Sequence, residues 1–195
     1  MIVLASKSAA RRAVLTGAGV AYEAVVAGVD EDAVKTELLA AGGGPREVAA
    51  ELAERKALKV SHERPELVVG ADQTLDLDGA LYDKVDTLDA ARVRLLELRG
   101  RTHRLHSGVA AAQAGAVVWR ELVTTTLTMR DFSDAFLDDY LAREGEAALG
   151  SVGCYRLEAI GAQLFSKIEG DYFSILGLPL LGLLDVLRAR GEVTA

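Results

Sequence analysis

The chain has 195 residues, half of them hydrophobic, and a formal net charge of -7 at pH 7. This acidic balance argues against a general nucleic-acid binder, because phosphate backbones need a basic surface. No apolar run reaches the ~18–20 residues of a membrane span, and the short apolar start Met1–Ala5 lacks the basic segment of a signal peptide. Since Cys154 is the only cysteine, no internal disulfide can form, and we expect a cytoplasmic protein.

The first half of the chain alternates predicted strands with predicted helices. Ser8 is a suitable N-cap for the first helix, and Gly17 is a suitable stop. Pro45 follows three glycines and suits the first position of the second helix. The predicted elements are, in chain order, a strand Ile2–Ala5, a helix from Ser8 to about Thr16, a strand Tyr22–Val29, a helix from Pro45 to about His62 and a strand Leu67–Ala71.

The second half predicts a hairpin between two helices, then a last strand and a last helix. The predicted elements are a helix that Thr87 caps and Gly100 ends, strands Leu105–Ala112 and Val117–Met129 joined near Gly115, a helix that Ser133 opens, a strand Leu164–Ile168 and a helix ending at Gly191. No internal repeat or linker interrupts the sequence. We therefore expect one α/β domain over residues 1–195, with a mixed central β-sheet and flanking helices.

Asp72 follows the predicted central strand, whose Val68 and Val69 are typical of a buried strand. The strand prediction places Asp72 at the carboxyl end, where open α/β sheets form their ligand clefts. A catalytic acid and an acid that merely caps a turn both fit this position.

Ser8, Arg11 and Arg12 lie at the predicted start of the first helix. Backbone N–H groups and the positive end of the helix dipole favour an anion there. Two arginines in the first turn oppose that dipole unless an anion offsets the repulsion. The sequence therefore fits either a phosphate site or two solvated arginines paired with acids elsewhere.

Three further charged positions are candidates. Glu31 lies in the run Asp30-Glu31-Asp32 at a predicted strand end, which is either a solvated turn or a ligand set for Mg²⁺. Lys56 continues an apolar helix stripe, so it either snorkels or points into a cleft. Lys84 falls on the next predicted strand and is uninformative alone.

These scattered signals resemble the Maf family of nucleoside triphosphate pyrophosphatases along almost the whole chain. The matching stretches are Leu4–Arg12, Val29–Glu31, Leu52–Ala57, Gly70–Gln73, Leu98–His103, Leu164–Tyr172 and Gly177–Leu180. The resemblance implies two lobes around a deep cleft. It also implies hydrolysis of a nucleoside triphosphate to the monophosphate and pyrophosphate, with a divalent cation (Mg²⁺, Mn²⁺ or Co²⁺) as cofactor.

The same resemblance implies roles for the candidate residues. Asp72 would be the proton acceptor and would share the metal with Glu31. Lys56 and Lys84 would neutralise the triphosphate. Ser8 and Arg11, with the neighbouring Arg12, would bind phosphate. The sequence Asp83-Lys84-Val85 departs from the usual Gly-Lys-Pro of the family at the two positions that flank Lys84.

Gln73 and Glu158 resemble the branch of the family that acts on 7-methyl-GTP. A glutamate can accept hydrogen bonds from N1–H and the 2-amino group of guanine, and a glutamine amide can donate to O6. We therefore expect a guanine-type base. Ala10 stands where that branch has tryptophan, so a cationic methylated base would lose its stacking surface.

The leading hypothesis is thus an enzyme that removes non-standard nucleotides. A regulator of cell division that binds nucleotide without turnover is the alternative, although a pure binder needs no water-activating acid. An unrelated α/β hydrolase is disfavoured, since the chain has no Gly-x-Ser-x-Gly nucleophile elbow. Oligomeric state is left open, and a homodimer is one candidate assembly.

Overall fold

A seven-stranded mixed sheet runs the length of the molecule in the computed structural model, which describes residues 1–194. The strands are β1 (Ile2–Leu4), β2 (Tyr22–Ala24), β3 (Val68–Leu77), β4 (Ala80–Tyr82), β5 (Thr102–Gln113), β6 (Ala116–Met129) and β7 (Phe165–Glu169). Their order in the sheet is β2-β1-β3-β5-β6-β7, and β4 pairs with β3. β1 is parallel to β2 and β3, whereas the other pairs are antiparallel.

Helices flank this sheet, as the sequence predicts. They are α1 (Ala9–Gly17), α2 (Glu31–Ala40), α3 (Pro45–Ser61), α4 (Leu88–Leu98), α5 (Asp134–Glu144), α6 (Tyr172–Ile175) and α7 (Leu180–Ala189), with 3₁₀ turns at Gly145–Gly150 and Ile160–Leu164. The predicted N-caps Ser8, Thr87 and Ser133 each accept a hydrogen bond from the N–H three residues further on. None of the helices in residues 1–194 is long and apolar enough to cross a membrane.

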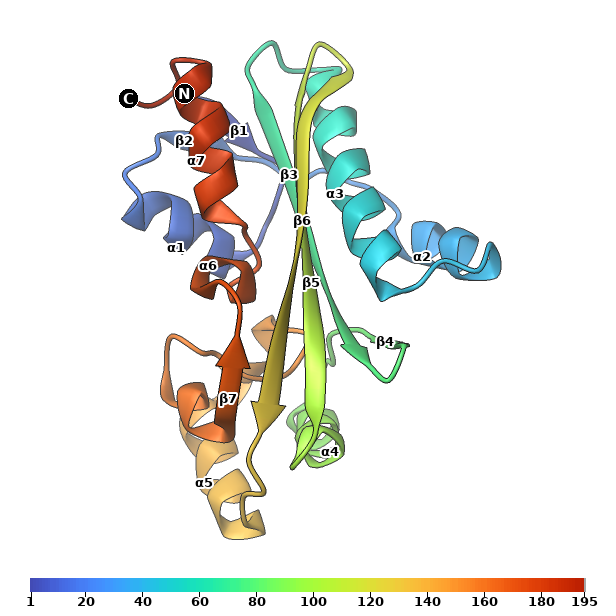
Figure 1. Ribbon diagram of the computed structural model, residues 1–195, viewed down its shortest axis with the longest axis vertical. Helices are drawn as coiled ribbons and strands as arrows, with labels where there is room; N and C mark the ends of the chain where they lie inside the picture. Colours follow the sequence, from blue (N-terminus) through green and yellow to red (C-terminus); the bar gives the residue numbers. More distant parts are fainter. Residues whose placement is uncertain (195) are drawn as a thin grey trace.

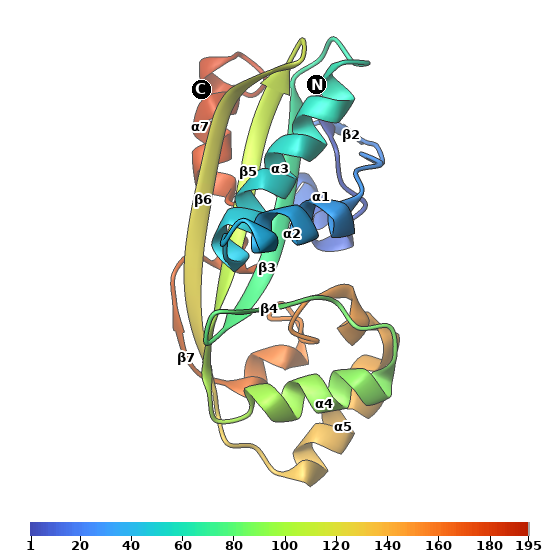
Figure 2. The same ribbon diagram turned by 90° about the vertical axis from the view of Figure 1, so that its right-hand side faces the viewer.

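The elements form two lobes (Figures 1 and 2). The first, called here the terminal lobe, holds both chain ends and contains β1, β2, α1, α2, α3 and α7; the second is the α4–α5 lobe. Each lobe has its own apolar cluster, one around Leu15 and Leu183, the other around Leu95 and Tyr140. The long strands β3, β5 and β6 connect the two lobes. The predicted mixed α/β architecture with two lobes is therefore confirmed.

Two expected strand ends were wrong. Asp72 does not end a strand, because β3 continues to Leu77 and pairs with β5 through Asp76. The polar residues after Ala71 remain in the strand because their backbone groups pair with β5. The acid run does not end a strand either, since β2 stops at Ala24.

The acids instead begin α2, a helix that the sequence reasoning missed. The Asp30 side chain accepts from the N–H of Ala33 and caps the helix, and Glu31 occupies its first turn. Asp30 and Glu31 thus sit at the positive end of a helix dipole, which favours acidic side chains. Lys84 also differs from expectation: β4 stops at Tyr82, and Lys84 lies in an irregular segment before α4.

Candidate active site

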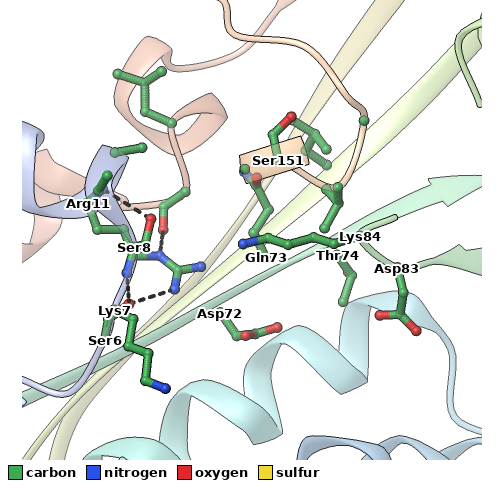
Figure 3. A pocket seen from close by; sticks show the side chains of 18 of the residues that line it. Ser6, Lys7, Ser8, Arg11, Asp72, Gln73, Thr74, Asp83, Lys84 and Ser151 are labelled. Atoms are coloured by element: carbon green, nitrogen blue, oxygen red, sulfur yellow. Dashed lines mark hydrogen bonds between the residues drawn. The ribbon is translucent and has the colours of Figure 1, made fainter. Parts of the chain in front are cut away.

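A cleft of about 1230 Å³ opens between the two lobes (Figure 3). Its walls come from the β1–α1 turn, α2, α3, β3, the segment after β4 and the chain that follows α5. Six cationic and six acidic side chains line it: Lys7, Arg11, Lys35, Lys56, Lys84, Arg156, Glu31, Asp32, Asp72, Asp83, Glu146 and Glu158. The cleft is therefore balanced in formal charge, although the whole chain has 22 cationic and 29 acidic side chains. Such a wall suits an anionic ligand better than the rest of the surface does.

Three of the predicted residues meet on one side of the cleft. Lys56 Nζ donates to Oδ1 of Asp72 at 2.6 Å and lies 2.8 Å from Oε1 of Glu31. Lys56 and Asp72 are both buried, whereas Glu31 is exposed at the cleft mouth. One ammonium group thus joins two carboxylates that come from different elements, β3 and α2.

Asp72 has the electrostatics of a poised base. Burial raises its pKa, while the nearby charges of Lys56 and Arg11 act in the opposite direction. Its Oδ1 is committed to Lys56, but Oδ2 accepts no hydrogen bond from any group in residues 1–194. The carboxylate therefore keeps one oxygen for a proton from a molecule in the cleft.

Two glycines explain why α3 can bring Lys56 so close to β3. A Cβ at Gly70 on β3 would overlap the carbonyl oxygen of Ala53, and one at Gly108 on β5 would lie 2.5 Å from the carbonyl oxygen of Ala49. Both carbonyls belong to α3, so the helix backbone rests directly on the sheet at these points. Close backbone approach is a typical reason for glycine inside a strand.

The Arg11 guanidinium makes most of its hydrogen bonds to other groups of the protein. Nε donates to the carbonyl of Gly177 at 2.8 Å, and Nη1 donates to the carbonyl of Ala71 at 2.9 Å and to Oγ of Ser6 at 3.1 Å. Arg11 therefore fastens α1 to the residue before Asp72 and to the chain before α7. Because this side chain turns back to carbonyl groups, the first turn of α1 needs no bound anion to offset its charge. Only Nη2 of Arg11 makes no hydrogen bond within residues 1–194.

Of the other predicted residues at the start of α1, two line the cleft and one does not. Ser8 lines the cleft and caps the helix, with Oγ accepting from the N–H of Arg11. Ala10 also lines the cleft and presents only a methyl group there. Arg12 is exposed and is not part of the cleft wall. The structure therefore brings Ser8, Ala10 and Arg11 to the site but leaves Arg12 outside it.

Lys84 reaches the centre of the cleft (Figure 3). Its amino group forms no hydrogen bond or ion pair with any residue from 1 to 194. Desolvation in the cleft and the nearby charge of Arg11 lower its pKa, against the attraction of Asp72 and Glu31. A lysine without a partner in such a place is suited to bind a ligand anion.

Gln73 lies beside Asp72 but is engaged with the protein. Its Nε2 donates to the carbonyls of Ser174 and Ile175, at 2.9 and 3.1 Å, and lies 2.9 Å from Oγ of Ser107. The two carbonyl acceptors fix which end of the amide carries the N–H groups. Gln73 therefore ties β3 to α6, and in this arrangement only its carbonyl oxygen is left for a base.

Glu158 is exposed on the cleft wall formed by the α4–α5 lobe. Its Oε1 lies 3.5 Å from Nε of Arg156, which also lines the cleft. Arg156 Nη1 lies 3.6 Å from Oε2 of Glu144. The guanidinium of Arg156 is thus attracted to two carboxylates without a short hydrogen bond to either, which leaves donors facing the cleft.

Glu31 and Asp72 are the residues available to hold a divalent cation. Their oxygens converge on a single point, the ammonium of Lys56, and carboxylate oxygens are the ligands that Mg²⁺ and Mn²⁺ prefer. No group of three or more His, Cys, Asp or Glu side chains within residues 1–194 is arranged to bind a metal. Two carboxylates nevertheless suit Mg²⁺, which usually keeps several waters and substrate phosphate oxygens.

Among the cleft residues that sequence reasoning missed, Lys35, Asp83 and Arg156 make the contacts that bear most on the site. Lys35 lies on α2, so it could not be placed while that helix was unrecognised. Asp83 directly precedes Lys84, and Arg156 lies two residues before Glu158. Their only sequence signal is proximity to candidates that had already been selected.

Comparison with known proteins gives a consistent result. The family model described as "Maf-like protein" matches residues 1–190. A Caulobacter vibrioides protein named "Nucleoside triphosphate pyrophosphatase" is 61% identical over 99% of this chain and 97% of its own length. A Granulibacter bethesdensis protein of the same name is 51% identical over 99% and 98%. A Rhizobium meliloti protein named "7-methyl-GTP pyrophosphatase" is 46% identical over 100% and 98%.

Proposed function

Because the chain belongs to the Maf-like protein family, we propose that it hydrolyses a nucleoside triphosphate to the nucleoside monophosphate and pyrophosphate in this cleft. The single observation that carries the proposal is the buried Asp72 carboxylate, which is paired with Lys56 through one oxygen and keeps the other for a proton. The names of relatives that match the whole chain support the reaction type. In the cell such a reaction would remove non-standard nucleotides.

Asp72 acts on the attacking water. Oδ2 accepts a proton from a water molecule aligned with the α-phosphorus, the new P–O bond forms there, and the bond to the bridging oxygen of the β-phosphate breaks. The leaving group is pyrophosphate. A positioned carboxylate base typically contributes a factor of about 10² to 10⁴ to the rate. The raised pKa of Asp72 suits this role, because it makes the carboxylate a stronger base.

The cations stabilise charge on the phosphates. Lys84, which has no partner among residues 1–194, binds phosphate oxygens directly, and Nη2 of Arg11 and the hydroxyl of Ser8 add further donors. Preorganised donors of this kind supply most of the catalysis in phosphoryl-type transfer, since the developing charge lies on phosphate oxygens. Lys56 fixes the positions of the Asp72 and Glu31 carboxylates.

Glu31 and Asp72 would hold a divalent cation, Mg²⁺, Mn²⁺ or Co²⁺, together with phosphate oxygens and water. When bound, such a cation supplies charge neutralisation at the phosphates. The two carboxylates meet at the Lys56 ammonium, so a cation there would compete with Lys56 for their oxygens. Burial opposes ionisation of Glu31, but the hydrogen bond from Lys56 and the charges of Lys56, Lys35 and Arg11 together lower the pKa of Glu31, so Glu31 remains an anionic ligand.

The base is proposed to be guanine-like, and its recognition falls mainly to Glu158 and Arg156. Glu158 accepts from N1–H and the 2-amino group, as the sequence suggests. The donor for O6 is Arg156 rather than Gln73, whose N–H groups are held by carbonyl groups of α6. Arginine is a common donor to O6 and N7 of guanine. Ala10 offers no stacking surface, so a methylated base gains nothing there.

A nucleotide panel tests the proposal. Purified protein is incubated with each common nucleoside triphosphate and 7-methyl-GTP, with Mg²⁺ or Mn²⁺, and both pyrophosphate and orthophosphate are measured. The expected result is metal-dependent release of pyrophosphate and monophosphate in equal amounts, fastest with a guanine-type base. Release of orthophosphate and a nucleoside diphosphate, or no hydrolysis of any nucleotide, would overturn the proposed reaction.

A further inference from the structure

Lys84 lies on a segment that has no regular secondary structure, between β4 and α4. Its own side chain makes no hydrogen bond or ion pair with residues 1–194, so nothing at the amino group fixes it. The position of Lys84 in the cleft therefore depends on how the backbone beside it is held. That backbone belongs to Asp83.

We propose that Asp83, gripped by Lys35 from one lobe and by Arg94 from the other, is a positioning residue that holds Lys84 in place. The inference rests on the proposed function, in which Lys84 binds phosphate. It adds an ion pair across the cleft mouth whose task is to keep that lysine at the phosphates. Neither Asp83 nor Lys35 needs to touch the reacting atoms for this role.

The grip from the terminal lobe is the Lys35 side chain on α2. Its Nζ lies 2.7 Å from Oδ1 of Asp83 and 3.4 Å from Oδ1 of Asp32. The Lys35 side chain is only 16% exposed, whereas that of Asp83 is 57% exposed. Burial works to lower the pKa of Lys35, but the hydrogen bonds to Asp83 and Asp32 and the charges of these two acids together raise it. Lys35 therefore stays charged, and the pair is shielded from solvent on the lysine side.

The grip from the α4–α5 lobe is the Arg94 side chain on α4. Its Nη1 donates to the carbonyl of Asp83 at 2.9 Å and to the carbonyl of Val152 at 2.7 Å. The guanidinium carbon lies 4.4 Å from the centre of the Tyr82 ring, which adds a cation–π contact just before Asp83. The residue next to Lys84 is thus held through its carboxylate from one side and through its carbonyl from the other.

The pair also links the lobes at the cleft mouth. Lys35 belongs to the terminal lobe with Glu31, and Asp83 belongs to the segment that leads into the α4–α5 lobe (Figure 2). An ion pair near the protein surface contributes little to stability, so stability is a poor reason for this contact. Placement matters more, because a shift of about 1 Å in a group that binds phosphate can cost on the order of 10²-fold in rate.

A double-mutant cycle tests whether Asp83 acts through Lys84. Pyrophosphate release is measured for Asp83→Ala, Lys84→Ala and the double variant, with Asp86→Ala as the matched control. Asp86 is exposed, lies three residues further along and does not line the cleft. Asp83→Ala should lower kcat/KM about tenfold in the wild-type background and have little further effect beside Lys84→Ala. Two effects that multiply, or an equal loss in Asp86→Ala, would overturn the proposal.

Exchanging the charges of Lys35 and Asp83 separates positioning from a general effect on stability, because only positioning predicts that kcat/KM recovers when both charges are reversed. Lys35→Glu and Asp83→Lys should each lower kcat/KM, and the two together should restore a large part of it, because the ion pair is rebuilt with reversed charges. A double variant no better than the worse single variant would contradict the positioning role. Urea unfolding midpoints of all variants should stay close to that of the wild type.

Failure of the proposed function is separable from failure of this inference. If the wild type releases no pyrophosphate from any nucleotide, the proposed reaction fails. The same cycle is then measured as binding of inorganic triphosphate by calorimetry. Coupled losses of affinity at Asp83 and Lys84 would still support the positioning role, and independent losses would refute it.

Discussion

Lys56 Nζ lies 2.6 Å from Oδ1 of Asp72, and both side chains are buried. The pair couples a strand residue to a helix residue at the floor of the cleft, and Glu31 completes it from α2. Burial raises the pKa of Asp72, and the charges of Lys56 and Arg11 and the hydrogen bond from Lys56 oppose that rise. The protonation of the base therefore depends in part on the contact with Lys56.

Lys56→Met should show that dependence directly. Without the ammonium, the pKa of Asp72, already raised by burial, rises further, and a larger fraction of the protein holds a protonated Asp72 at any given pH. We expect kcat/KM to fall at least about 10²-fold at neutral pH and the acid limb of its pH profile to move to higher pH. Lys56→Arg keeps the charge and should move the limb much less. An acid limb that stays in place in Lys56→Met would contradict this reading.

Glu158→Gln should change the choice of base. The glutamine amide offers one acceptor and an N–H₂ donor where the carboxylate offered two acceptors, so it no longer matches N1–H and the 2-amino group of guanine. We expect kcat/KM for GTP to fall on the order of tenfold relative to that for UTP, because one hydrogen bond to the base is lost and one donor of the base meets another donor. Glu146→Gln is the control, since Glu146 also lines the cleft but no base contact is proposed for it. Unchanged selectivity in Glu158→Gln would refute the base assignment.

Gly108→Ala should destabilise the protein because α3 rests on this residue. The added methyl group would meet the backbone of Ala49 and Ala50, which cannot move like a flexible side chain. We expect a loss of about 1–3 kcal/mol in the free energy of unfolding, measured by urea titration. Gly150→Ala is the matched control, since no atom lies within 4 Å of a Cβ there. Equal stability of both variants would mean that α3 is not in direct contact with the sheet.

His103 should make stability depend on pH. It is buried, Nε2 lies 2.7 Å from the Tyr155 hydroxyl, and burial lowers its pKa from 6.5 to about 4. Between these values the unfolded chain binds a proton that the folded chain does not, so stability falls as the pH drops from 6.5 towards 4. Each pH unit in that window costs about 1.4 kcal/mol, or about 3 kcal/mol in total.

The difference between wild type and His103→Gln isolates this effect from the titration of carboxylates. Urea unfolding at pH 6.5 and at pH 5 should show the wild type losing about 2 kcal/mol more than the variant over that interval. His62→Gln should behave like the wild type, because His62 is exposed. If His103→Gln loses as much stability as the wild type, the buried histidine is not the acid-sensitive group.

Local signals in the sequence were enough to predict most helices. Ser8, Thr87 and Ser133 cap their helices as expected, because a cap is a hydrogen bond between residues only three apart. The hairpin near Gly115 was predictable for the same reason: Ala114 and Gly115 both have positive φ, 50° and 75°, as a tight turn between two strands requires.

Elements that depend on distant partners were predicted poorly. α2 was missed because it buries only Val34, so its apolar stripe is too weak to read. The sequence predicts too early an end for β3, because its second half is stabilised by pairing with β5, about thirty residues away, and its own residues are not typical of a strand. Asp72 consequently lies within a strand instead of at its end.

The site shows the same division. Glu31, Lys56 and Asp72 could each be nominated from residue type and resemblance, and the structure brings them together. Their mutual contacts were not predictable, since they require α2 and the close packing of α3 on Gly70. The contact between Lys35 and Asp83 joins one lobe to the other, and no sequence pattern predicts it.

The proposed reaction is tested most directly by pyrophosphate release from wild type and Asp72→Asn, with folding monitored by circular dichroism and triphosphate binding by calorimetry. Asparagine keeps the shape of the side chain but cannot take the proton of the attacking water. The predicted result is a loss of at least about 10²-fold in kcat, with an intact fold and retained binding. Turnover of Asp72→Asn at the wild-type rate would contradict the assignment of Asp72 as the base.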